Sequence, residues 1–300
     1  MHVRACMPWR GVLSYMYSWA VRDTSVAPPK WIATASVEAL DLSTMRWSGA
    51  GCMPALSDPR ASHSVSVSTD GSVVAVCGSY NLGAADRTAR WRWSPEGGEW
   101  ASLPDLPEER QCPACVSLRD GRTLVIGGFV DDMDVYEDHG IHMMEGQPVA
   151  SVLALAAGGS EWSAPAPMAQ TRWDATAVVL PDGKVLVAGG KSAEQPDSAL
   201  KTAELYDPAT NAWTALPEMA HERSYPAVCV LPSGRVAVVG GRGADSQPRK
   251  ECEAFGPVKR KWEALPEMDA APGNAAAPVA GGIIVVGRET TELFDEESGR

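Results

Sequence analysis

One pattern returns about every 50 residues along this chain of 300 residues. Each copy carries a tryptophan, then an arginine, and then a doublet of small residues whose second member lies eighteen residues after the arginine. A period of this size is typical of stacked or radially arranged units that cannot bury a core alone. The tryptophans are Trp47, Trp100, Trp162 and Trp213, the arginines are Arg60, Arg110, Arg172 and Arg223, and the doublets end at Gly78, Gly128, Gly190 and Gly241.

The copy that runs from Arg172 to Leu216 predicts four short strands. Residues 173–180 are rich in β-branched side chains, and Pro181-Asp182-Gly183 then supplies a tight turn. Residues 184–190 form a continuous apolar run, which is expected of a strand that is covered on both faces. Residues 202–206 alternate polar and apolar, and 212–216 make a last short strand. Four antiparallel strands joined by short loops are the pattern of a propeller blade.

These motifs resemble those of kelch-repeat proteins, the family that includes propellers of the galactose-oxidase kind. The resemblance rests on the glycine doublets, the spaced arginines and the Glu-Leu-Tyr-Asp-Pro-x-Thr-x-x-Trp of residues 204–213, and it covers essentially the whole chain. It implies an all-β, kelch-type β-propeller in which the strand after the arginine lies innermost and the tryptophan strand outermost. Such motifs are specific for the fold and nearly silent on function.

Counting strands along the chain predicts a single domain, residues 1–300, with six four-stranded antiparallel blades. The expected blades span residues 1–50, 51–104, 105–165, 166–217, 218–266 and 267–300. In the other repeats a tryptophan follows the position equivalent to Glu292 by nine residues, and here that tryptophan would fall beyond Arg300. The sixth blade is therefore expected to lack its outer strand and to have an unpaired strand at its edge. This count indicates that the sequence is a fragment. The alternative is that a strand from a partner fills the vacant position.

The net charge of -12 argues against a nucleic-acid partner or an anionic membrane surface, because either needs a basic patch. The apolar run at residues 12–21 is interrupted by polar residues and fits a strand better than a signal peptide. Seven cysteines show no zinc spacing and no disulfide framework, which favours a reducing, cytoplasmic location. Cys112 and Cys115 lie in a predicted strand and are expected to be small apolar fillers, with a redox or metal pair as the alternative.

The loops from second to third strands, and from fourth strands to the next repeat, should emerge on one face of the fold. That face gathers the candidate binding residues Arg60, Arg110, Arg172, Arg223, His63, Trp173 and Tyr225, together with His221, Glu222 and Asp174. The guanidinium groups could grip carboxylates or an acidic peptide by forked hydrogen bonds. Alternatively, the arginines pair with neighbouring acids such as Glu109, Glu222 or Asp174 and tie the blades together.

The longest insertion, residues 129–148, holds several carboxylates and the histidines His139 and His142. These groups could bind a divalent cation if a helical turn forms, although no known metal motif is present. A long loop on a propeller more often shapes a binding rim or is solvated. We therefore predict no metal site.

The sequence shows no serine, histidine and aspartate pattern typical of a catalytic triad and no phosphate-binding loop. We therefore predict no catalytic residue and no cofactor. The leading hypothesis is a noncatalytic scaffold whose loops bind a protein or peptide of unknown identity. The alternative is a copper-radical oxidase of the galactose-oxidase type that acts on sugars or alcohols. That chemistry needs two histidines, two tyrosines and a crosslinked cysteine, an arrangement that the five histidines and six tyrosines do not match.

Overall fold

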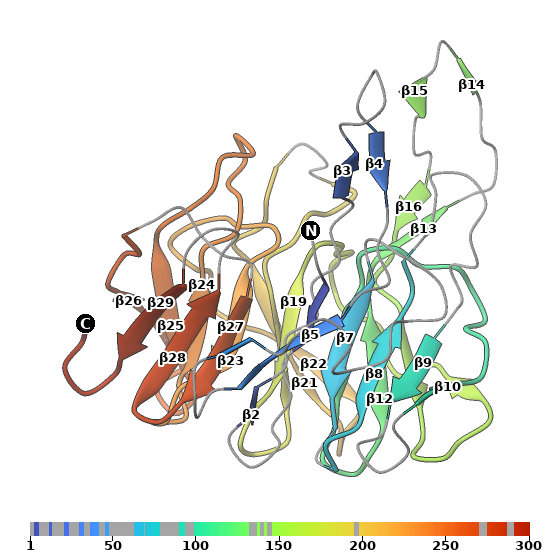
Figure 1. Cartoon of the computed structure of the whole chain (residues 1–300), viewed down its shortest axis with the longest axis horizontal. Coiled ribbons are helices and arrows are strands. Elements are labelled where there is room, and N and C mark those ends of the chain that lie inside the picture. Colours follow the sequence, from blue (N-terminus) through green and yellow to red (C-terminus); the bar gives the residue numbers. More distant parts are fainter. Residues whose placement is uncertain are drawn as a thin grey trace. The chain divides into compact units, whose positions relative to one another are not determined.

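Short strands joined by turns and loops make up the chain in this computed structural model (Figure 1). The backbone is described at residues 3–5, 12–13, 21–23, 30–32, 37–41, 46–47, 63–68, 70–78, 90–93, 99–131, 137–138, 141–142, 146–194, 198–269, 275–286 and 291–300. Within these ranges no helix is long and apolar enough to cross a bilayer.

Four consecutive four-stranded sheets follow one another in the order that the repeat predicts. The first strand of each sheet begins four residues after the arginine of its repeat. The sheets are β7 (Ser64–Val67), β8 (Val73–Val76), β9 (Arg90–Trp93) and β10 (Trp100–Ser102); β11 (Ala114–Ser117), β12 (Thr123–Ile126), β17 (Val152–Leu155) and β18 (Trp162–Ser163); β19 (Thr176–Val179), β20 (Val185–Ala188), β21 (Ala203–Asp207) and β22 (Ala212–Ala215); and β23 (Ala227–Val230), β24 (Val236–Val239), β25 (Cys252–Gly256) and β26 (Lys261–Leu265).

The sheet β19–β22 shows how the local sequence sets the register. The turn at Gly183 has φ of 87°, and its N–H donates to the carbonyl of Leu180 at 2.9 Å, which closes the β19–β20 hairpin. Glycine adopts this left-handed conformation at no steric cost. Tyr206 then pairs with Trp213 across β21 and β22, and their rings lie 5.0 Å apart. The four strands predicted for this repeat are confirmed.

The core lies between successive sheets. Every residue of β20 and of β24 is buried, as expected for strands that are covered on both faces. Leu186 and Ala188 of β20 pack with Val236 and Val238 of β24, while Ala237 and Val239 face the next sheet. Each fully buried valine or leucine contributes roughly 1.5–3 kcal/mol relative to an exposed one. One sheet therefore cannot bury its apolar residues without its neighbours, which explains why the unit is repeated.

The chain divides into two compact units. The first comprises residues Met1–Val125, Phe129–Gln147 and Leu153–Ser163, and the second comprises Ile126–Gly128, Pro148–Val152 and Ala164–Arg300. In the second unit the first strands of successive sheets lie beside one another, β19 next to β23 and β23 next to β27 (Ala275–Val279). In the first unit β7 lies beside β11 in the same way. The expectation of a single domain stays a prediction.

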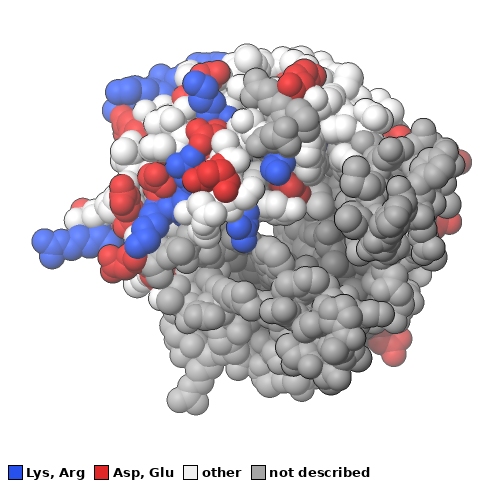
Figure 2. Space-filling view, turned by 90° about the horizontal axis from the view of Figure 1, so that it is seen from above, with Lys and Arg blue, Asp and Glu red and all other residues white. Residues whose placement is uncertain are grey.

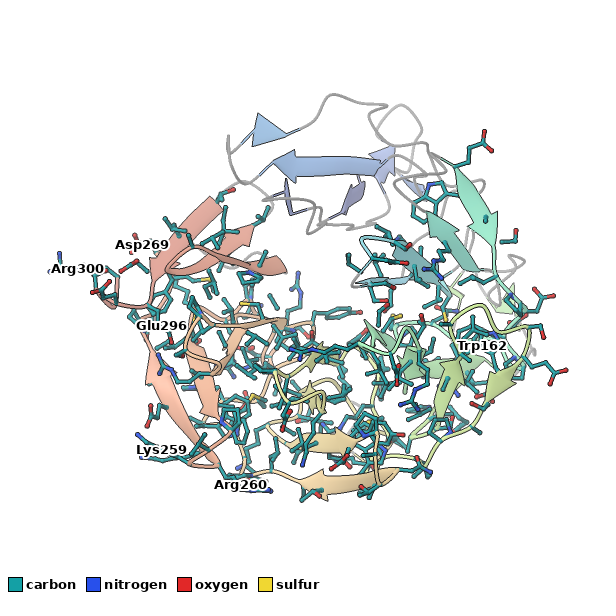
Figure 3. The ribbon with its side chains drawn as sticks, turned by 90° about the horizontal axis from the view of Figure 1, so that it is seen from below. Trp162, Lys259, Arg260, Asp269, Glu296 and Arg300 are labelled. Carbon is teal, nitrogen blue, oxygen red and sulfur yellow. The ribbon has the colours of Figure 1, made fainter. Side chains whose placement is uncertain are left out.

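The last sheet has three strands, β27, β28 (Gly282–Val286) and β29 (Thr291–Asp295). Within the described ranges no fourth strand pairs with β29, as the strand count predicts. Leu293 of β29 is 63% exposed, although the equivalent Ala254 of β25 is fully buried. Glu296, just after β29, binds Arg235 at 2.8 Å and so ties this sheet to the preceding one (Figure 3).

The first sheet departs from the prediction. It contains β1 (Val3–Ala5), β2 (Val12–Leu13), β5 (Val37–Asp41) and β6 (Arg46–Trp47), but β1 pairs with β5 in parallel, where an antiparallel β1–β2 pair is expected. A further pair, β3 (Val21–Asp23) with β4 (Lys30–Ile32), stands apart from it. Tyr17 and Ser18 replace the glycine doublet in this repeat, so the signal that marks the end of the second strand is missing here.

Two further expectations are corrected. Cys112 precedes β11 and has φ of 50°, so it does not lie in a strand with Cys115. In the insertion, β13 (Phe129–Asp131) pairs with β16 (Gly146–Pro148), and β14 (Glu137–Asp138) pairs with β15 (Ile141–His142). His142 is therefore in a strand and not in the helical turn that the metal hypothesis requires. His139 lies outside the described residues.

Candidate functional site

The repeated arginines lie inside the protein. Arg172 is 1% exposed, and its guanidinium donates to Glu204, to the carbonyl of Gly189 at 3.0 Å and to Thr202. Arg223 is fully buried and donates to Glu253 at 2.8 Å and to the carbonyl of Gly240 at 2.7 Å. Each arginine thus holds the glycine doublet and the third strand of its own repeat.

The glycine doublets make room for the arginine of the next repeat. Gly190 donates its N–H to the carbonyl of Arg223 at 2.9 Å, and Gly128 donates in the same way to Arg172 at 2.7 Å. A Cβ atom on Gly189 would lie 2.3 Å from the carbonyl oxygen of Arg223. Arginine and doublet therefore recur together because they form one hydrogen-bonded junction between consecutive repeats.

The acid that receives the arginine comes from the third strand, nine residues before the tryptophan. Glu204 and Glu253 also accept the backbone N–H of Ala169 and of Ala220, at 2.8 and 2.7 Å. In the β11–β18 sheet, Leu153 occupies this position, and Arg110 instead donates to Glu108 at 3.1 Å. Glu108 thus replaces the missing third-strand acid.

These contacts favour one of the two sequence hypotheses for Arg172 and Arg223. Both guanidinium groups are almost fully buried and donate to several acceptors within the protein, which supports the ion-pair alternative. Of the acids suggested as their partners, Glu222 pairs with Arg249 instead. Arg110 is equally buried, and Arg60 lies outside the described residues. The regular spacing of Glu204 and Glu253 before their tryptophans was the sequence signal for the true partners.

Trp173 and Tyr225 lie where the loops were expected to emerge. Trp173 is half-buried and exchanges backbone hydrogen bonds with Lys191, the residue after the doublet. Tyr225 is 40% exposed, has φ of 51° and donates its N–H to the carbonyl of Asp174 at 2.8 Å. The structure therefore brings the segments around Trp173 and Tyr225 together within the second unit. His63 is half-buried and belongs to the first unit.

Two cavities flank the segment 218–222, which precedes Arg223. The first, here called the acidic pocket, has a volume of about 310 Å³ and is lined by residues 218–221, 251–253, 262, 264, 265 and 267. The second has a volume of about 480 Å³ and is lined by residues 170, 198–202, 218, 220, 222 and 244. Sequence reasoning missed both cavities, because their walls come from strand ends and loops that only the sheets bring together.

Four glutamates line the acidic pocket, and they differ in their surroundings. Burial alone would raise the pKa of Glu253, but hydrogen bonds from the N–H of Ala220 and from Arg223 outweigh it and hold that pKa below its usual value. The hydrogen bond to its own backbone lowers the pKa of Glu251. Glu218 is exposed and forms a 2.7 Å ion pair with Lys201. Glu267 is also exposed.

The face at the top of Figure 1 has a mixed charge. In Figure 2, which shows this face, acidic and basic side chains lie next to one another over the described part of the surface. The described part of this face therefore carries no broad basic patch.

A model of the Kelch motif matches residues 174–220, which run from Asp174 through the sheet β19–β22 into the next repeat. The chain belongs to the kelch-repeat family. An F-box/kelch-repeat protein of Arabidopsis thaliana is 33% identical over 168 residues, which cover 53% of this chain and 37% of that protein. The chain thus spans little more than a third of the length of this kelch relative.

Solved structures agree with the kelch assignment at the level of the fold. The structure titled "Structure of YjhT" matches with a TM-score of 0.58 and 16% identity, covering 73% of this chain and 68% of that one. The chain is an all-β propeller. The galactose oxidase of Gibberella zeae is 29% identical over 91 residues, which cover 30% of this kelch chain but only 12% of the oxidase.

The residues that the sequence offered as copper ligands fall in both units of this kelch protein. His63 belongs to the first unit, whereas His221 and Tyr225 belong to the second. Among the residues that the structure describes, no group of three or more histidines, cysteines, aspartates and glutamates could hold a metal ion.

Proposed function

We propose that this protein is a noncatalytic, protein-binding kelch scaffold that presents its loop-face residues, in the second-to-third-strand loops and in the segments that join consecutive repeats, to a protein or peptide. The observation that supports this proposal is the placement of the exposed Tyr225, the half-buried Trp173 and the two cavities in the second unit. Concave sites with aromatic side chains on a rigid scaffold are typical of ligand-binding surfaces. We further propose six blades, the sixth with three strands.

The internal position of the arginines supports separate roles for two parts of the repeat, one structural and one in recognition. Arg172 and Arg223 are used for the junction between repeats, so they are part of the scaffold. The residue two positions after each arginine differs between repeats, as Cys112, Asp174 and Tyr225 show, although all three have positive φ. A fixed backbone position with a variable side chain is suited to recognition.

A peptide-display selection against the whole protein tests the proposal. Peptides that bind should lose affinity for Tyr225→Ala and Trp173→Ala by about tenfold or more, as expected when an aromatic anchor is removed from an interface. Lys259→Ala is the matched control, because Lys259 is exposed in the β25–β26 turn, where its side chain points away from the sheets (Figure 3). Equal loss in all three variants, or no selectable binder, would count against the proposal.

The partial similarity to galactose oxidase supports a second candidate, an oxidase acting on sugars or alcohols. Within the described part of the chain, no group of three or more histidines, cysteines, aspartates and glutamates is placed to hold copper. Incubating the protein with Cu²⁺ and a panel of sugars and alcohols, and measuring hydrogen peroxide, tests this candidate. Peroxide formed only with copper and substrate would favour the oxidase over the scaffold.

We also propose that the protein acts in a reducing, cytoplasmic compartment. Within the described ranges, Cys115, Cys229 and Cys252 are buried and form no disulfide. Fractionation of source cells with an antibody against the protein tests this location.

A further inference from the structure

The acidic pocket combines an apolar floor with an anionic rim. Met219, Cys252 and Trp262 are almost fully buried and form the floor, and Leu265 is partly buried beside them. The rim carries glutamates, and no lysine or arginine lines the pocket. A volume of about 310 Å³ is at the small end of the range for ligand pockets. It suits a single long side chain better than a cofactor.

The preceding repeat shows what is special about this pocket. At the equivalent positions, Gln170 accepts a 2.7 Å hydrogen bond from the hydroxyl of Thr202, and this bond joins the loop to the third strand. His221 and Glu251 occupy these positions in the next repeat. Glu218 replaces Pro167 on the same rim. The preceding repeat thus has a hydrogen bond between two neutral side chains at this place. In the next repeat, three substitutions put ionisable groups around a cavity instead.

The basic groups nearest the pocket do not cancel its charge where a ligand would enter. Arg223 is fully buried and bound to Glu253, so it neutralises the innermost carboxylate. Arg249 lies 3.6 Å from Glu251 and also binds Glu222. Lys201 binds Glu218, but both side chains are about half exposed, and such a pair contributes little and is easily displaced.

We propose that the acidic pocket binds an arginine side chain of a peptide partner. The aliphatic part of the arginine lies against Trp262, Met219 and Leu265, and its guanidinium donates to the carboxylates of Glu218 and Glu267. Arginine is preferred over lysine because its planar group binds carboxylates in a forked geometry and stacks on an indole. The proposal rests on the proposed scaffold function and names the partner chemistry for one part of that surface.

The test uses capped Gly-Xaa-Gly peptides in which Xaa is arginine, citrulline, lysine or glutamate, titrated into the full chain and followed by NMR or calorimetry. The arginine peptide should bind at least about tenfold more tightly than the citrulline peptide, which has the same shape without the charge. The E218Q/E267Q double variant should lose most of this preference. E161Q/E297Q changes the net charge equally at exposed sites outside the pocket and should keep it.

Equal affinity for the arginine and citrulline peptides, or an arginine preference unchanged by E218Q/E267Q, would overturn the proposal. These outcomes are separate from failure of the scaffold function. Display-selected peptides that depend on Tyr225 but not on Glu218 or Glu267 would retain the scaffold and reject the arginine pocket. A circular dichroism spectrum identical to that of the parent protein shows that the double variant is folded.

Discussion

Arg172 donates from both Nε and a terminal nitrogen to the same carboxylate oxygen of Glu204, each at 3.2 Å, across 32 residues of chain. Both side chains are almost fully buried. Burial lowers the pKa of Arg172, and Glu204 opposes that effect, so the charged pair is maintained within the junction between repeats. The equivalent pair, Arg223 with Glu253, repeats the arrangement in the next sheet.

Arg172→Ala should destabilise the protein strongly, by roughly 3–5 kcal/mol, because it leaves Glu204 charged and buried without its partner. Urea denaturation measures the free energy of unfolding. Lys201→Ala removes an exposed partner of Glu218 and should change the free energy of unfolding much less than Arg172→Ala, because exposed ion pairs contribute little. Similar losses in the two variants would show that Arg172 is not part of the scaffold.

Gly189→Ala should cost more than Gly183→Ala, although both glycines have positive φ of 66° and 87°. A left-handed conformation costs an L-residue about 1–2 kcal/mol at either position. At Gly189 the new Cβ also meets the carbonyl oxygen of Arg223, whereas at Gly183 nothing lies within 4 Å. The measurement is the free energy of unfolding of each variant. Equal costs would contradict the close junction.

Glu253→Gln should weaken the protein at neutral pH by roughly 1.5–3 kcal/mol, because hydrogen bonds to a charged acceptor are lost. The folded-state pKa of Glu253 lies below its usual value. The stabilisation is therefore complete above the ordinary carboxyl pKa of about 4.3 and disappears as the pH falls through the lower folded value.

Urea denaturation between pH 3 and pH 7 checks this dependence. The difference in stability between the parent protein and Glu253→Gln should shrink below about pH 4.3. Glu297→Gln, at an exposed site, should show almost no difference at any pH. A difference that grows with acidity would have the wrong sign for this account.

Buried thiols should resist alkylation in the folded protein. Burial raises the pKa of Cys115 to about 12 and that of Cys252 to about 11, so little reactive thiolate forms near pH 8. Iodoacetamide labelling followed by peptide mass spectrometry should modify these cysteines only after urea is added. Equal labelling rates with and without urea would show that the two sites open readily.

Part of this structure follows from local sequence. The Pro-Asp-Gly turn at 181–183, the apolar run of β20 and the aromatic positions of Tyr206 and Trp213 each determine a strand or a hairpin within one repeat. Repetition of these signals predicts the series of four-stranded sheets. In the first sheet, where Tyr17 and Ser18 replace the doublet, the predicted strand pairing is wrong.

The exposure and the ion pairing of the charged side chains could be determined only from the tertiary structure. Arg172 could be read as a surface ligand group or as a structural one, because its spacing is the same in either case. Only the approach of β21 places Glu204 against it, and burial then makes the pair structural. The acidic pocket likewise needs the segment 218–221, β25 and β26 in one place. Sequence determines local hydrogen bonding and hydrophobic period, whereas side-chain exposure and charge pairing depend on which distant segments pack together.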